Sequence, residues 1–115
     1  MGRKSRTKGR HYELEVVHAH EPIGVPCRRT QHAGMSQDDA PDLLVGDVLH
    51  AECKRRARGF ATLYKMLGDH DLLFVRDDQH GTLVVQPWDT YVALITCWHE
   101  SGCPTSWVPL PKESE

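Results

Sequence analysis

The sequence lacks the features that define several broad classes of protein. Apolar runs such as residues 72–75 and 83–85 are far too short to cross a bilayer. The N-terminus is basic with no apolar stretch behind it, so we expect no signal peptide. The four cysteines include no C-x-x-C pair, which argues against a disulfide framework or a ready zinc site. These absences exclude a membrane protein and a disulfide-stapled toxin.

What remains is the composition of one small globular domain. The chain has 115 residues, of which 39% are hydrophobic and 26% charged, and this length suits a single core. Neither G-x-x-x-x-G-K-[ST] nor G-x-G-x-x-G occurs, so we expect no nucleotide cofactor. We expect one domain over residues 1–100 with a flexible basic arm at 1–8, and an irregular, proline-containing tail at 101–115.

Charge is distributed unevenly along the chain. Residues 1–58 carry 11 Lys/Arg and 8 Asp/Glu, whereas residues 59–115 carry 3 and 8. The basic residues form one cluster in the first ten positions and another just after residue 53. Local basic patches of this kind are typical of proteins that bind a polyanion, although a solvated arm and a solvated strand end would look the same.

Hydrophobic periodicity predicts an α/β fold in the order α-β-β-β-α-β-β-α, with one mixed sheet and helices packed on it. The polar stretch 31–40 reads as a long loop. The expected helices cover residues 7–20, 58–67 and 88 onward, and the expected strands cover 25–30, 42–45, 48–54, 71–76 and 82–86.

The register of the hairpin at Gly46-Asp47 decides which side chains meet. A two-residue turn would place Asp42 opposite Ala51, on the core face. A connection one residue longer, or a bulge, places Asp42 opposite Glu52. Only this second register gathers the apolar side chains of both strands on one face, so we predict it. The side chains that it gathers are Leu43, Val45, Leu49, Ala51 and Cys53.

This register brings two carboxylates within about 5 Å. Two carboxylates that close repel each other unless a cation lies between them, and Mg²⁺ with its preference for oxygen ligands is the natural cation. Strand alternation places His50, Glu52 and Lys54 on the same face. Lys54 could then orient a water molecule or neutralise charge on a phosphate. The alternative is a solvated surface cluster without chemistry.

Two segments resemble the PD-(D/E)xK nuclease superfamily. Pro41-Asp42 and Glu52-Cys53-Lys54 match its two half-motifs on a hairpin, and the upstream residues 8–15, KGRHYELE, look like the first-helix signature of archaeal-type Holliday junction resolvases. The resemblance covers about residues 7–98. It implies a restriction-endonuclease-like fold, in which a mixed central β-sheet is flanked by helices.

The resemblance also implies roles for individual residues. Asp42 and Glu52 become metal ligands together with the backbone carbonyl of Cys53, and Lys54 becomes the catalytic lysine. Glu13 becomes the helix carboxylate that completes the acidic site. Glu15 is its rival, since the two lie about 200° apart on a helix and only one can face the site. The family also tends to have a serine or similar polar residue in the loop before the Pro41-Asp42 strand. Here the match is loose, and the candidates are Thr30, Gln31, His32 and Ser36.

The function implied is a Mg²⁺-dependent endodeoxyribonuclease that cuts four-way DNA junctions by symmetric nicks, with Mn²⁺ able to substitute. We expect a cytoplasmic homodimer, encoded by a cell or by a phage that infects it. The alternatives are a nuclease for flaps, nicks or damaged duplex, and a non-catalytic DNA-binding module. The residues expected to bind DNA are Arg3, Lys4, Arg6, Lys8, Arg10, Arg28, Arg29, Arg55, Arg56 and Arg58.

Other residues invite competing interpretations. His50 shares the face of Glu52 and could touch substrate or metal. Cys97, His99 and Cys103 suggest zinc, but three soft ligands at this spacing favour plain thiols. Trp88 and Tyr91 have helical spacing, which favours a core or dimer-interface position over a platform for stacking bases.

Overall fold

The computed structural model describes residues 2–30 and 42–102. It is an α/β structure with three α-helices and two small antiparallel sheets. The elements in chain order are α1 (Gly2–His20), the 3₁₀ turn η1 (Glu21–Ile23), β1 (Cys27–Arg29), β2 (Leu43–Val45), β3 (Leu49–Ala51), α2 (Ala61–Leu67), β4 (Leu73–Val75), β5 (Leu83–Val85) and α3 (Trp88–Glu100).

The first helix is longer than the sequence predicts. It begins at Gly2 instead of residue 7, so the basic segment continues the helix where a flexible arm was expected. Arg and Lys are good helix formers, and extending a helix that is already nucleated needs only one more hydrogen bond per residue. At the other end Pro22 lies in η1, and Gly24 closes that turn with a left-handed φ of 72°, a conformation that suits glycine.

The three-stranded sheet has the order β1-β2-β3 and carries the predicted hairpin register. Val45 pairs with Leu49, and Leu43 pairs with Ala51. The connection is one residue longer than a tight turn, as expected, and both Gly46 and Asp47 have positive φ, at 60° and 65°. The apolar alternation therefore fixed the register correctly. On the core face Leu43 and Val45 are buried.

The predicted single mixed sheet is wrong for the described residues. β4 and β5 form their own two-stranded antiparallel sheet, with Phe74 opposite Val84. Each of these strands has three residues, and both Phe74 and Val84 are exposed. Periodicity identified the strands but could not show which neighbour each would choose, because a short apolar run carries no pairing information beyond its own hairpin.

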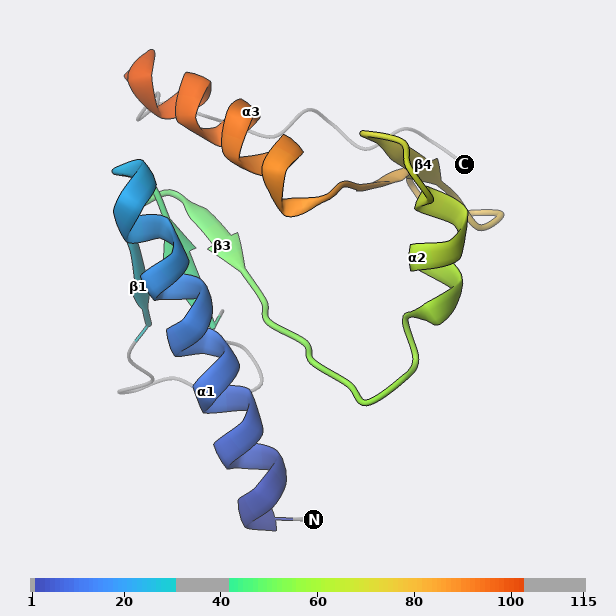
Figure 1. Cartoon of the computed structure of the whole chain (residues 1–115), viewed down its shortest axis with the longest axis horizontal. Helices are drawn as coiled ribbons and strands as arrows, with labels where there is room; N and C mark the ends of the chain where they lie inside the picture. Colours follow the sequence, from blue (N-terminus) through green and yellow to red (C-terminus); the bar gives the residue numbers. More distant parts are fainter. Residues whose placement is uncertain (1, 31–41, 103–115) are drawn as a thin grey trace.

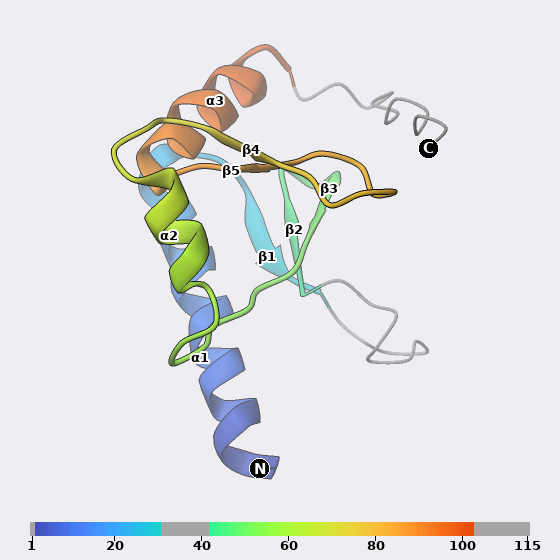
Figure 2. The same ribbon diagram turned by 90° about the vertical axis from the view of Figure 1, so that its right-hand side faces the viewer.

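The core lies where α1, the three-stranded sheet and α3 meet. Val25, Val45 and Ile95 form its buried centre, and Figures 1 and 2 show α3 passing over the end of α1 and the sheet. Buried His20 joins the two helices, since its Nε2 lies 2.7 Å from the Tyr91 hydroxyl. Tyr91 packs against this buried centre, as expected of a core position, whereas Trp88 is 43% exposed.

The second helix differs from its prediction in where it begins and in how much of it is buried. It begins at Ala61 rather than residue 58, and Leu67 is buried. Tyr64, which lies three positions before Leu67 and so on the same side of the helix, is 77% exposed. The extended segment 52–60 holds α2 away from the three-stranded sheet in the view of Figure 1, so this helix buries a narrower stripe than its sequence offers.

Candidate functional site

Asp42 stands at the start of β2, opposite the point where β3 ends. Its half-buried carboxylate accepts a hydrogen bond from the backbone N–H of Cys53, with 2.8 Å between Oδ2 and the nitrogen. Its own carbonyl accepts a hydrogen bond from the N–H of Thr30 at 3.2 Å. Asp42 is therefore held from two sides, by the residue that follows β1 and by the segment that follows β3. It is the residue that the sequence predicts as a metal ligand.

Glu52 and Lys54 follow β3 and alternate with half-buried residues. Both are exposed, and the Lys54 Nζ lies 3.5 Å from the Glu52 Oε2. His50 is exposed two residues earlier, in agreement with the predicted alternation. An exposed pair of this kind contributes little to stability. Breaking the pair so that Glu52 or Lys54 binds a ligand would therefore cost little.

Glu13 approaches from α1 and is held by a residue of the sheet. Its Oε1 accepts a hydrogen bond from the Arg29 Nε at 3.0 Å, and the two side chains are 18% and 37% exposed. Glu15, the rival on the same helix, is exposed. Of the two glutamates, Glu13 is thus the one that α1 turns toward the sheet.

Cys53 lies among these carboxylates. Burial, and after it the negative charges of Asp42, Glu13 and Glu52, raise the pKa of its thiol to about 11. All three carboxylates that the sequence assigned to one site therefore act on a single sulfur atom.

The residues match the chemistry of a metal site but not, as they stand, its geometry. Carboxylate and carbonyl oxygens are the donors that hard divalent cations prefer. Within residues 2–30 and 42–102, however, no group of three or more His, Cys, Asp or Glu side chains is placed to hold an ion. Each carboxylate is turned to a protein partner: Glu13 to Arg29, Asp42 to the N–H of Cys53, and Glu52 to Lys54.

The basic residues expected to bind DNA lie on three elements. Five belong to α1, where Arg10 is exposed. Arg55, Arg56 and Arg58 are exposed on segment 52–60, which runs away from the three-stranded sheet toward the same end of the molecule as the first half of α1 (Figures 1 and 2). The Arg56 guanidinium lies 5.8 Å from the centre of the Phe60 ring.

The two arginines of β1 behave differently. Arg28 is exposed and lies 3.6 Å from Asp47 of the hairpin turn. Arg29 is half-buried and is bonded to Glu13. Sequence reasoning grouped the two as phosphate-binding residues, and no signal in the sequence separates them beyond the period-2 alternation that sends neighbouring side chains to opposite faces.

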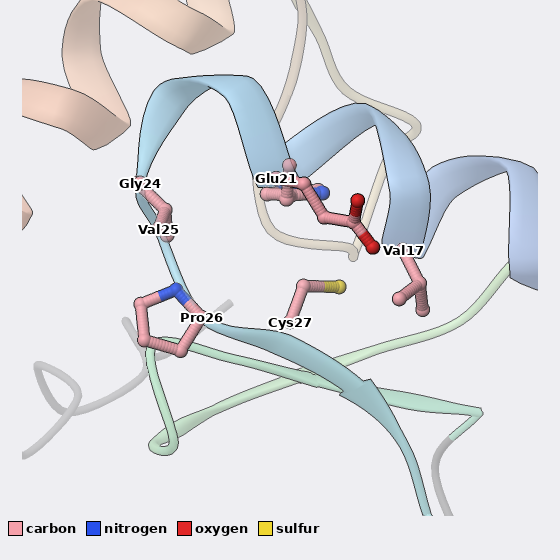
Figure 3. A pocket seen from close by; sticks show the side chains of 7 residues that line it. Val17, Glu21, Gly24, Val25, Pro26 and Cys27 are labelled. Carbon is pink, nitrogen blue, oxygen red and sulfur yellow. The ribbon is translucent and has the colours of Figure 1, made fainter.

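A cavity of about 370 Å³ lies apart from these carboxylates, between the end of α1, η1 and β1 (Figure 3). Val17, Glu21 and Cys27 project into it, and buried His20 forms part of its wall. Burial raises the pKa of the Cys27 thiol, so Cys27 stays protonated at neutral pH. We assign this cavity no chemistry.

Several expectations fall on residues outside the described ranges. The loop candidates Gln31, His32 and Ser36 lie there, as does Cys103, the third residue of the alternative zinc site. Cys97 is an exposed free thiol. His20 has a structural role that the sequence did not indicate, since it is hydrogen-bonded to Tyr91, 71 positions along the chain.

The described helices include none that is both long enough and apolar enough to span a membrane. Comparison of the chain with protein-family models, with curated proteins and with solved structures returned no match.

Proposed function

We propose that the chain is a metal-dependent endodeoxyribonuclease that cuts branched DNA, and four-way junctions in particular. The observation that carries the proposal is the hairpin register: continued by one residue beyond the pair Leu43–Ala51, it sets Asp42 opposite Glu52, and Lys54 follows two residues later. Glu13 reaches the neighbouring strand from α1, where it bonds Arg29, the residue that pairs with Leu43 beside Asp42. The three free thiols of the described residues suit the reducing cytoplasm.

In this proposal each residue has a distinct task. Asp42, Glu52 and the Cys53 carbonyl would hold the ion, and Glu13 would complete its shell. Bound Mg²⁺ would supply Lewis-acid stabilisation of charge at the scissile phosphate. Lys54 would hold a phosphate oxygen by charge. The exposed arginines of segment 52–60 and α1 would position the DNA backbone without reading its sequence.

Symmetric nicks require two sites, so we propose a homodimer around a twofold axis. The described surface offers a candidate contact on α2 and the β4–β5 hairpin, where large apolar side chains are exposed, and such patches mark interaction sites. They are Tyr64, Met66, Phe74, Leu83 and Val84. We expect wild type to scatter light as a dimer and Phe74→Glu as a monomer; equal masses for both would place the contact elsewhere.

The test of activity uses labelled four-way junction, fork, flap and linear duplex, each with Mg²⁺ and with chelator. We expect metal-dependent cleavage that favours the junction. Asp42→Asn, Glu52→Gln and Lys54→Ala should each abolish cleavage without preventing binding. Asp42→Asn retains a side-chain oxygen for the Cys53 N–H, so its stability should stay near wild type, whereas Asp42→Ala should lose about 1–3 kcal/mol with that charged hydrogen bond.

One observation favours the second candidate, a DNA-binding module without activity. The three candidate ligands Glu13, Asp42 and Glu52 are each engaged by a protein group, and the described residues form no preassembled metal site. Binding to the junction with no cleavage in Mg²⁺ or Mn²⁺ would support this alternative. Cleavage of linear duplex at the same rate as junction would instead support a nuclease of broader substrate range.

A further inference from the structure

Residues 54–65 form a strongly basic stretch that runs from the end of β3 into α2. They include five Lys/Arg and no Asp/Glu. Arg55, Arg56 and Arg58 are exposed, and in the part of the chain that the structure describes none of the three has a carboxylate partner. Figure 1 shows this stretch leaving β3 and turning back into α2. Its positive charge therefore faces solvent, where a polyanion can reach it.

Two aromatic residues belong to the same stretch. Tyr64 is 77% exposed, and its N–H donates to the Phe60 carbonyl at 3.2 Å, which places it one helical turn beyond Phe60. Residues four apart share one face of a helix, so Tyr64 lies on the side of α2 where the half-buried Phe60 lies. Exposed rings among exposed cations are typical of surfaces that bind single-stranded nucleic acid, because bases stack on the rings and phosphates bind the cations.

Arg56 has a defined position on this surface. Its guanidinium lies 5.8 Å from the centre of the Phe60 ring, within the range of a cation–π contact. A Cβ on Gly59 would lie 3.1 Å from the Arg56 Cδ, so the lack of a side chain at Gly59 leaves room for the arginine to reach Phe60. Phe60 thus has a cation beside it and Tyr64 one turn farther along. A cation that is already ordered loses less entropy when it binds a phosphate.

We propose that residues 55–64 form a binding site for an unpaired stretch of DNA, in which Tyr64 stacks on a base and the three exposed arginines hold phosphates. The inference rests on the proposed function for the choice of DNA, and it names the part of a branched molecule that is bound. Forks and flaps carry such a stretch, whereas linear duplex keeps its bases stacked on one another. The site needs neither a metal ion nor cleavage, so it is independent of which branched DNA is cut fastest.

Tyr64 was counted above with the apolar patch that is a candidate dimer contact. A twofold contact uses the same surface on both copies. Centred on Tyr64, it would bring the arginines of the two copies together, and juxtaposed like charges oppose association. We therefore assign Tyr64 to the DNA and leave the dimer contact to the β4–β5 hairpin.

The test measures binding by fluorescence anisotropy in chelator, so that neither metal nor cleavage takes part. The probes are a labelled oligothymidine and an abasic oligomer of the same length, which carries the same phosphates without bases. We expect wild type to bind the oligothymidine more tightly by about fivefold or more, the lower end of what stacking on one base contributes. Tyr64→Ala should remove this preference, because both probes then bind through phosphates alone, and Tyr64→Phe should keep it.

Matched variants separate the ring and the charges from the rest of the surface. Leu94→Ala removes an exposed apolar side chain from α3 and should leave the preference unchanged. Arg56→Gln should weaken the binding of both probes and lower the slope of log affinity against log salt by about 0.7. Arg28→Gln removes an exposed arginine from β1 instead, so its slope should stay that of wild type.

The outcomes separate the site from the function on which it rests. Equal binding of the two probes by wild type would overturn the site, as would a Tyr64→Ala variant that keeps the preference. If that variant is also monomeric in light scattering, the ring belongs to the contact between copies. If wild type prefers the oligothymidine but cuts no branched DNA, the site stands and the nuclease is wrong. If it cuts branched DNA but shows no preference, the site alone is wrong. The comparison of probes on wild type needs no variant, so the test holds even where a substitution prevents folding.

Discussion

The hydrogen bond between His20 and Tyr91 should be the most costly polar contact to remove from the described core. His20 is 2% exposed, and its Nδ1 lies 2.8 Å from the carbonyl oxygen of Val16, which can only accept. Nδ1 therefore carries the proton in the neutral ring, and Nε2 accepts from the Tyr91 hydroxyl at 2.7 Å. Tyr91→Phe removes the donor but leaves the buried nitrogen without its partner.

An unsatisfied buried acceptor of this kind costs about 1–3 kcal/mol. For a domain of this length that corresponds to a fall in Tm of about 4–12 °C, measured by calorimetry or circular dichroism. Tyr64→Phe is the matched control, because it removes the same hydroxyl from a side chain that is 77% exposed. A Tyr91→Phe variant within about 0.5 kcal/mol of Tyr64→Phe would refute the reasoning, since surface substitutions fall in that range.

Two further predictions concern the hairpin turn and the thiols. Asp47 has a φ of 65°, so Asp47→Val should lower the free energy of unfolding in urea by about 1–2 kcal/mol. Asp47→Gly loses the same exposed ion pair with Arg28 but should not lose this stability. Equal losses for the two variants would contradict the turn argument. Alkylation followed by mass spectrometry should label exposed Cys97 at pH 8 and Cys53 only slowly. The pKa of Cys53 is raised to about 11, so its labelling should rise between pH 9 and 11, and the stability that its neutral thiol contributes should be lost over the same range.

The sequence was most informative where one face of a strand is buried. Leu43 and Val45 alternate with half-buried residues, and a slip of one position would have exposed both, so the hairpin register could be derived without coordinates. The same holds for α3, where Tyr91 and Ile95 share a face at helical spacing. In each case local periodicity and burial specify the same arrangement.

Long-range choices could not be derived in this way. Periodicity predicts that β4 and β5 are strands, but it does not show whether they pair with the other three strands. The prediction of a single sheet was therefore wrong. The pairing of Glu13 with Arg29 links residues 16 positions apart on a helix and a strand, and it depends on how the helix crosses the sheet. Sequence reasoning found both residues and gave each a ligand outside the protein, because charge patterns alone do not reveal which charges neutralise each other.

The extended segment 52–60 has a consequence for how the chain opens. Its residues belong to no helix or strand, and most are exposed, so little structure holds it in place. The part of the chain that follows it, α2 with the isolated β4–β5 hairpin, is of a size that is only marginally stable without further packing. Local unfolding should therefore begin beyond this segment, with the amides of β4 and β5 exchanging hydrogen before those of β2. The carboxylates at Asp42 and Glu13 lie in the part that opens last.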